Sequence, residues 1–324
     1  MNNKVSIIIP VFNVENYILR CLDSCINQTY RNIEIICVND CSTDESENEI
    51  IRMLNADNRI KLLKNSENSG VFFSKDKGAK CADGDFLFFL DGDDYLPTNS
   101  IENLLENLND TVDIISGNME FVSEKTFESI NTLSWSIFGN LNNNDFLKMI
   151  IELNHWSQCG MLIRKSIYDK IKYLPFSVKI REDALIMMQL CNCVHKIVCI
   201  DETVYFYVQR QSSALHRQKN NDERAIEDFT YASEASKIIK ELPNISKENE
   251  YLIRSELIKE LSWTLKSKIV LKENQSFISN LIRGHLRTKG MFKFILKENG
   301  VKSLLMYIAS YFYPRFWILA RLFN

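Results

Sequence analysis

Residues 5–40 read VSIIIPVFNVENYILRCLDSCINQTYRNIEIICVND, and their hydrophobic pattern indicates the class of fold. It opens with a short run rich in β-branched residues, which is typical of a strand buried on both faces. Apolar side chains then recur at helical spacing, at Ile18, Leu19, Leu22 and Ile26, before IEIICVND repeats the strand pattern. A strand, a helix and a second strand in this order predict parallel strands joined by a right-handed crossover.

The alternation continues to residue 91. A capped, acid-rich start predicts a helix over 42–56, and strands are expected at 59–65 and 85–91 with a helix over 70–82 between them. This order predicts a Rossmann-like α/β domain whose mostly parallel central sheet is flanked by helices. After about residue 217 the pattern becomes amphipathic and helical, which predicts a helical C-terminal region.

Composition limits the partners. The chain has 324 residues and a net charge of −3, so nothing indicates a nucleic-acid partner. The apolar run in MNNKVSIIIPVFN is too short for a signal peptide, and no window is long enough to span a bilayer. We therefore expect a cytoplasmic protein. Its nine cysteines are expected to be small buried hydrophobes in a reducing compartment.

Polar residues follow three of the predicted strands. Asn13 and Glu15 follow the first, Asp40 ends the second, and the fourth runs into Asp91-Gly-Asp93. The carboxyl ends of strands in one sheet form the edge where ligands bind. The chain lacks both GxGxxG after the first strand and GxxxxGK[ST], so a different group must neutralise a bound diphosphate. A divalent cation held by carboxylates, Mn²⁺ or Mg²⁺, is the natural candidate.

These motifs, in this order, resemble family 2 glycosyltransferases of the GT-A fold. The resemblance rests on VSIIIPVFNVENYILRCLDSCINQTYRNIEIICVNDCSTDES and on NSENSGVFFSKDKGAKCADGDFLFFLDGDD, so it is close over residues 4–110. It implies that Asp93 binds the metal that bridges the donor phosphates, with Asp91 touching the donor and contributing to the metal site. It also implies a nucleotide-sugar site, usually for a UDP-sugar, formed by Pro10, Val11, Asn13, Glu15, Asp40, Lys75, Asp76, Asp91 and Arg210.

The chain departs from the family pattern at two places. Asn39 and Cys41 stand where the family often has Asp and Gly, and the Ala-Arg-Asn of the third helix is here Ser74, Lys75 and Asp76. Lys75 keeps the positive charge, but as a point charge instead of a planar fork. These departures concern the identity of the donor.

The resemblance extends more thinly to about residue 215. It implies that Asp183, in REDALI, is the catalytic base that activates an acceptor hydroxyl, with Glu182 and Trp156 binding or orienting the acceptor. A metal-bound leaving group and a base on the opposite face of the sugar predict inversion. The loop around Arg210 and His216 is expected to close on the diphosphate, and His216 is a further candidate metal ligand.

Each of these residues also has a plainer interpretation. Asp40 and Asp44 can cap the following helix, Asn13 and Glu15 can start a helix, and residues 91–94 can form a solvated turn. Glu182 and Asp183 can compensate a helix dipole, Trp156 can be core, and His216 can be a surface side chain.

The expected organisation is a GT-A catalytic domain over 1–216, with a nucleotide-sugar half at about 1–110 and an acceptor half at about 111–216, followed by a helical region over 217–324. From residue 281 onward, eight Lys or Arg face one acid, which gives a basic, aromatic tail of net charge +7. That tail can lie on the inner face of the cytoplasmic membrane, or it can form a homodimer contact or cover the core.

The function expected from the resemblance is metal-dependent, inverting transfer from a nucleotide-sugar donor. The acceptor is a saccharide or lipid-linked saccharide in bacterial surface glycan synthesis. The alternative is a non-catalytic glycan- or membrane-binding protein that keeps a degenerate GT-A fold. A nucleotidyltransferase is disfavoured, because the glycine- and Lys/Arg-rich loop for triphosphate binding is missing.

Overall fold

The computed structural model describes residues 3–135, 139–174, 177–178, 181–210, 221–264, 278, 280–291, 293–295 and 297. The chain divides into two compact units. Unit 1 comprises residues 1–176 and 189–217, and unit 2 comprises residues 177–188 and 218–324. Within the described ranges, no helix has the length and apolar character needed to cross a membrane. The basic aromatic tail beyond residue 297 and His216 lie outside the described residues.

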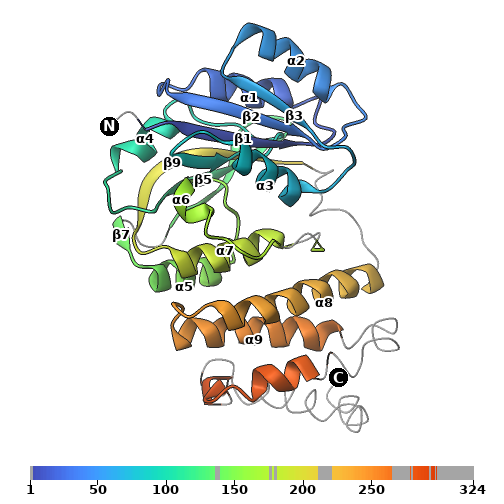
Figure 1. Cartoon of the computed structure of the whole chain (residues 1–324), viewed down its shortest axis with the longest axis vertical. Helices are drawn as coiled ribbons and strands as arrows, with labels where there is room; N and C mark the ends of the chain where they lie inside the picture. The colour runs from blue at the N-terminus through green and yellow to red at the C-terminus, as the bar shows by residue number, and fades with distance from the viewer. Residues whose placement is uncertain are drawn as a thin grey trace. The chain divides into compact units, whose positions relative to one another are not determined.

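Unit 1 is built on one mixed sheet with the strand order β3-β2-β1-β4-β8-β5-β9-β7, and β6 pairs with β5 (Figure 1). The parallel pairs are β1/β2, β2/β3, β1/β4 and β5/β9. Strand β8 runs antiparallel between β4 and β5. The strand bounds are β1 Val5–Val11, β2 Ile33–Asn39, β3 Ile60–Lys64, β4 Phe86–Phe89, β5 Ile114–Ser123, β6 Ser129–Leu133, β7 Gly139–Leu141, β8 Met161–Arg164 and β9 Ile197–Gln209.

The parallel strands are buried because helices cover both faces. Odd-numbered residues of β1, such as Ile7, share one apolar core with Leu22 of helix α1 (Ile18–Ile26), Ile50 of α2 (Ser46–Ala56) and Leu104 of α4 (Ser100–Glu106). Helix α3 (Val71–Cys81) packs on the other face through Gly78. A Cβ atom at that glycine would lie 2.5 Å from Ile8 Cγ2, so glycine permits the close approach of helix and sheet.

The remaining helices of the chain lie further along the sequence. Before α8 (Asn221–Ile238) they are α5 Asn143–Leu153, α6 Lys165–Tyr168 and α7 Glu182–Cys193. Tyr168 of α6 packs its ring 5.3 Å from that of Phe89 in β4. The predicted α/β architecture, with a mostly parallel sheet between helices, is confirmed.

A buried carboxylate fastens the amino ends of the strands. Glu34 of β2 accepts hydrogen bonds from the Ser6 hydroxyl at 2.5 Å and the Asp83 N–H at 2.8 Å. Its other oxygen forms ion pairs with Lys61 at 2.8 Å and Lys4 at 3.3 Å. Burial opposes ionisation of Glu34, but these partners outweigh it and lower its pKa to about 2. The cluster joins β1, β2, β3 and the turn before β4.

Unit 2 is helical where it is described, which confirms the predicted helical C-terminal region. Helix α8 (Asn221–Ile238) continues into the 3₁₀ turn η2 (Ile239–Glu241), and α9 (Lys247–Thr264) follows. His285 Nε2 lies 2.9 Å from the Ser236 hydroxyl, and its Nδ1 lies 2.9 Å from Arg254 Nη1. Because Arg254 can only donate, the His285 ring is neutral with its proton assigned to Nε2. Burial is the main cause that lowers the His285 pKa to about 3.

The first predicted helix has a different buried stripe from the one expected. Ile18 and Leu22 are buried as predicted, but Leu19 is 39% exposed and Ile26 is only partly buried. Cys21 and Cys25 occupy the buried positions instead, at i+3 and i+7 from Ile18. The predicted stripe was assigned from the aliphatic residues alone, whereas the two cysteines, which were expected to be buried, define the buried face together with Ile18 and Leu22. Six of the nine cysteines are buried.

Candidate active site

The strand order brings the predicted polar residues to one edge of the sheet. Strand β1 lies between β2 and β4, so the residues that follow these three strands are neighbours. Asp40 is anchored to β1 directly, because its N–H donates to the Val11 carbonyl at 2.8 Å. Leu90, just before Asp91, similarly donates its N–H to the Ile8 carbonyl at 3.0 Å. Asn13, Asp40 and Asp91 are therefore held at the carboxyl edge, as the alternation of strands and helices predicts.

The loop after β4 carries three carboxylates, and each has a different environment. Asp91 forms an ion pair with Lys75, whose Nζ lies 3.2 Å from Asp91 Oδ1. The Lys75 side chain is only 3% exposed. Asp91 Oδ1 is itself buried and accepts no geometrically complete hydrogen bond from the described residues. Helix α3 thus delivers one positive charge to the base of this loop.

Asp93 forms an ion pair with Arg210, which lies just beyond β9. The Arg210 guanidinium also stacks over the Tyr17 ring, 4.9 Å from its centroid. Burial and the neighbouring Asp91 raise the pKa of Asp93, while Arg210 acts in the opposite direction. The positive charge of Arg210 is therefore paired with Asp93, the carboxylate that the sequence predicts as the metal ligand.

Asp94 is buried, with 1% of its surface exposed. It accepts hydrogen bonds from the Tyr205 hydroxyl at 2.7 Å and the Val208 N–H at 2.8 Å. Burial, then the charges of Asp93 and Asp91, raise its pKa well above the usual range. This side chain supports the loop from inside the protein. The crowding of carboxylates is thus resolved by Lys75, by Arg210 and by burial of the third acid.

Asp40 organises the loop that begins helix α3. Its Oδ1 accepts from Asn65 Nδ2 at 2.7 Å and the Ser69 N–H at 2.8 Å, and its Oδ2 accepts from the Gly70 N–H at 2.8 Å. Gly70 has a φ of 92°, which favours glycine. Asp40 therefore does not cap α2. A carboxylate has about four acceptor positions, so Oδ2 keeps capacity for a further donor.

Asn13 and Glu15 tie the end of β1 to the start of α2. Asn13 Oδ1 accepts from the Thr43 N–H at 2.8 Å, and Glu15 Oε2 accepts from the Glu45 N–H at 2.9 Å. Asp44 accepts from the Ser46 N–H at 3.0 Å, but the N-cap residue of α2 is Glu45, so Asp44 lies one residue before the capping position predicted for it. These polar contacts fix the shape of the edge between β1 and β2.

The structure adds the exposure of one side chain and the backbone conformation of two residues at this edge. Pro10 and Val11 are buried within β1, whereas the aromatic side chain that follows them, Phe12, is 46% exposed. Asn13 has a φ of 51° and Cys41 a φ of 60°. The left-handed backbone at Cys41 explains why glycine is common at this position in the family, and its thiol lies 3.4 Å from the Asn65 carbonyl.

Tyr17 and Arg20 of the α1 region were also missed. Tyr17 donates a hydrogen bond to Glu124 beyond β5, and Arg20 Nη2 donates to the Asp93 carbonyl at 3.3 Å. The Arg20 guanidinium lies over the rings of Tyr95 and Phe127, at 4.7 and 4.3 Å. No linear motif connects these residues. Their only sequence signal is the i, i+3 spacing that places Tyr17 and Arg20 on neighbouring turns.

The remaining predicted residues lie as follows. Asp76 is buried and paired with Lys80 at 2.7 Å. Trp156 is half-buried in the segment between α5 and β8. Glu182 and Asp183 occupy the first turn of α7, which is preceded by Arg181 with a φ of 63°. Asp183 belongs to unit 2, while the carboxylate loop belongs to unit 1.

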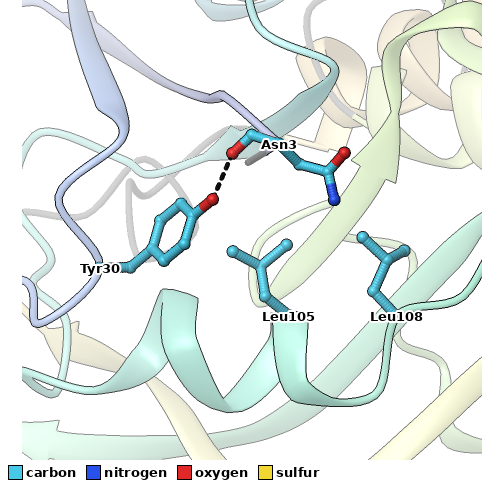
Figure 2. A pocket seen from close by; sticks show the side chains of 4 residues that line it. All are labelled: Asn3, Tyr30, Leu105 and Leu108. Carbon is cyan, nitrogen blue, oxygen red and sulfur yellow. Dashed lines mark hydrogen bonds between the residues drawn. The ribbon is translucent and has the colours of Figure 1, made fainter. Parts of the chain in front are cut away.

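Two further findings concern possible ligand sites. Among the described residues, no group of three or more His, Cys, Asp or Glu side chains is arranged to hold a metal ion. A pocket of about 130 Å³ is lined by Asn3, Tyr30, Leu105 and Leu108 (Figure 2). Asn3 and Tyr30 precede β1 and β2, so this pocket lies at the amino ends of the strands, away from the carboxylate loop.

Polar and charged side chains at the carboxyl edge of a mostly parallel sheet mark the edge where α/β proteins bind their ligands. The model of Glycosyl transferase family 2 matches residues 6–172, just over half of the chain, and the chain belongs to this family.

Relatives and solved structures agree with this assignment. The glycosyltransferase GlyA of Streptococcus pneumoniae is 29% identical over 231 residues, which are 66% of this chain and 32% of GlyA. The minor teichoic acid biosynthesis protein GgaB of Bacillus subtilis is 32% identical over 237 residues, or 68% of this chain and 25% of GgaB. The chain thus spans a third or less of these two relatives.

A crystal structure of S. aureus TarS in complex with UDP-GlcNAc matches with a TM-score of 0.70 at 18% identity. The match covers 95% of this chain and 90% of the TarS chain. It confirms the predicted fold class.

Proposed function

We propose that the protein transfers a sugar from a nucleotide diphosphate donor, most simply a UDP-sugar, to a saccharide or lipid-linked saccharide acceptor. The observation that carries the proposal is the shared edge of β2, β1 and β4, where Asp40, Phe12 and the Asp91–Asp94 loop are neighbours. An exposed aromatic side chain there offers a stacking surface for a base. The UDP-GlcNAc bound by the structurally similar TarS supports a UDP-linked donor.

A divalent cation fits the donor set of this loop. Asp91 Oδ1 is buried without a complete hydrogen bond from the described residues, and Asp93 supplies a second carboxylate two residues away. Mg²⁺ and Mn²⁺ commonly take one or two carboxylates and fill their remaining positions with substrate phosphates and water. That pattern accounts for a site with fewer than three protein ligands. Asp91 and Asp93 would hold the ion, which would stabilise negative charge on the leaving diphosphate.

The residues around the carboxylates have separate tasks in this proposal. Lys75 neutralises the charge of Asp91 before any ligand binds. Arg210 offers a guanidinium fork that matches the geometry of phosphate oxygens. Asn13 and Glu15 keep the β1 edge in register with the loop that carries Asp40.

Asp183 is the proposed catalytic base. A carboxylate is able to take the proton of the acceptor hydroxyl as that oxygen attacks the anomeric carbon, and attack opposite the leaving group inverts the configuration. It lies in the first turn of α7. Glu182 and Trp156 remain candidates for acceptor binding.

The proposed context is bacterial surface glycan synthesis on the inner face of the cytoplasmic membrane. The name of GgaB, a protein of minor teichoic acid biosynthesis, supports a surface polymer as the acceptor class. The domain assignment, 1–216 catalytic and 217–324 helical, and a membrane or homodimer role for the basic tail belong to the same proposal. Co-sedimentation of the full chain with anionic and neutral vesicles tests the membrane role, because attraction of a basic tail requires anionic lipid.

A donor screen tests the proposed activity. The protein is incubated with Mn²⁺ or Mg²⁺ and a panel of nucleotide sugars, and mass spectrometry follows donor hydrolysis while thermal unfolding follows binding. We expect one UDP-sugar to be hydrolysed and UDP to raise the unfolding midpoint, with both effects lost in Asp93→Asn. If no nucleotide diphosphate has either effect, and if D93N and D183N leave cellular function intact, the protein is the non-catalytic alternative.

A further inference from the structure

Strand β9 holds the carboxylate loop at successive points. The backbones of Phe206 and Tyr95 exchange two hydrogen bonds, of 2.9 and 3.3 Å. Two residues further along β9, the Val208 N–H donates to Asp94, and Arg210 then pairs with Asp93. The partner of the loop is thus a strand more than one hundred residues away in the sequence, next to β5 in the sheet (Figure 1).

The Tyr205 hydroxyl lies at the centre of this attachment. It accepts the N–H of Asp91 at 3.1 Å and donates to Asp94 Oδ2 at 2.7 Å. Tyr205 is completely buried and Asp94 is 1% exposed. The loop closes on itself as well, because the Asp94 N–H donates to the Asp91 carbonyl at 3.0 Å. One hydroxyl therefore fixes both ends of the turn that presents Asp91 and Asp93.

If the contact of Tyr205 and Asp94 with the loop only stabilised the fold, polar groups would not be needed there. Burying a carboxyl group in the core is costly, and replacing a buried polar pair by well-packed apolar residues is often neutral or stabilising. What the Tyr205–Asp94 pair adds is geometry. Its hydrogen bonds set the direction of the Asp91 backbone, whereas an apolar contact would leave that direction to packing alone.

We propose that Tyr205 and Asp94 are positioning residues that set the orientation of Asp91 and Asp93 for a divalent cation and a nucleoside diphosphate. The inference rests on the proposed function of the loop. Neither side chain reaches the surface, so both act through the loop backbone. A metal site tolerates little displacement of its ligands, which makes the orientation of this turn a determinant of affinity.

Tyr205→Phe tests the proposal, because it keeps the ring and removes only the hydroxyl. The control is Tyr30→Phe, which likewise removes only a hydroxyl and loses its hydrogen bond of 2.5 Å to the Asn3 carbonyl, at the opposite edge of the sheet (Figure 2). The first measurement is hydrogen exchange, without ligand, of the peptide covering residues 86–96. We expect faster exchange in Y205F and wild-type exchange in Y30F. Equal exchange in all three proteins overturns the proposal.

The second measurement is Mn²⁺ binding in the presence of UDP, by calorimetry. Tyr205→Phe removes two hydrogen bonds of the loop, those with the Asp91 N–H and with Asp94, which predicts a dissociation constant raised at least about tenfold in Y205F, with Y30F unchanged. Asp94→Asn, which keeps the shape but reverses the donor and acceptor at Tyr205, is expected to weaken Mn²⁺ binding similarly. Faster loop exchange with unchanged Mn²⁺ affinity refutes a positioning role. Absence of Mn²⁺ and UDP binding in the wild type refutes the proposed function, while hydrogen exchange still decides the role of Tyr205.

Discussion

Arg210→Met is the most informative single substitution, because Arg210 forms an ion pair with Asp93, the carboxylate proposed to bind the metal. The Arg210 and Asp93 side chains are 18% and 19% exposed, so their ion pair is largely shielded from water. A cation must displace the guanidinium before Asp93 can bind it. Methionine keeps an unbranched chain against the Tyr17 ring and removes the charge.

The expected magnitude follows from the interaction that is lost. A hydrogen bond to a charged group contributes about 1.5–3 kcal/mol, which corresponds to a factor of about 10 to 150 in a binding constant. We therefore expect R210M to bind Mn²⁺ at least about tenfold more tightly than the wild type when no nucleotide is present. The opposite effect is expected for UDP without metal, because the diphosphate loses its arginine partner.

Titration calorimetry with Mn²⁺ alone, UDP alone and both together separates these effects. In the wild type UDP should strengthen Mn²⁺ binding, because the diphosphate draws Arg210 from Asp93, and in R210M this coupling should shrink. Arg20→Met is the matched control, since Arg20 contacts Asp93 only through its backbone carbonyl. The Asp93 carboxylate therefore keeps its ion pair with Arg210 in this variant. If R210M binds Mn²⁺ no more tightly than the wild type without nucleotide, Arg210 does not compete for the site.

Three further predictions follow from other residues. Asp183→Asn should lower kcat by about 10²–10⁴-fold and leave UDP binding unchanged, and an unaltered kcat would exclude it as the base. Glu34→Gln should cost about 3 kcal/mol in urea unfolding at pH 7, since its pKa falls from 4.5 unfolded to about 2 folded. That contribution is complete above pH 4.5 and is lost as pH falls towards 2, so equal costs at pH 7 and pH 2 would contradict it. The neutral His285, with a pKa lowered from 6.5 to about 3, should make stability fall below pH 6.5 by up to about 1.4 kcal/mol per pH unit, and His285→Asn should flatten that slope in circular dichroism.

The sequence predicts the donor half of the fold well because its signals are local. Buried strands such as β1 and β2 differ clearly from the helices between them, and each is followed by a short polar segment. The position of Asp40 and Asp91 at one edge then follows from the rules of parallel sheets. The hydrogen bond from the Ser46 N–H to Asp44 at the start of α2 is equally local, since it needs only the next two residues.

What the sequence does not predict depends on contacts between distant segments. Nothing near Asp91 indicates that Lys75 neutralises it, and nothing near Asp94 points to Tyr205, which is 111 residues away. The partners of β5 and β9 are also non-local, because β8 inserts between β4 and β5 in the opposite direction. Side-chain burial on α1 was mispredicted for a different reason, namely the choice between cysteine and leucine on one helix face.

Cys41 offers a thiol-specific probe of the edge where the nucleotide is proposed to bind. The Cys41 thiol is half-buried and follows Asp40, and that of Cys193 in α7 is half-buried too. Six other cysteines are buried, and Cys81, at the end of α3, is exposed. A thiol-specific alkylating reagent would therefore modify Cys81 at once and Cys41 more slowly. With Cys81 as the internal standard, the alkylation rate of Cys41 becomes a footprint of site occupancy that requires no labelled ligand and no engineered residue.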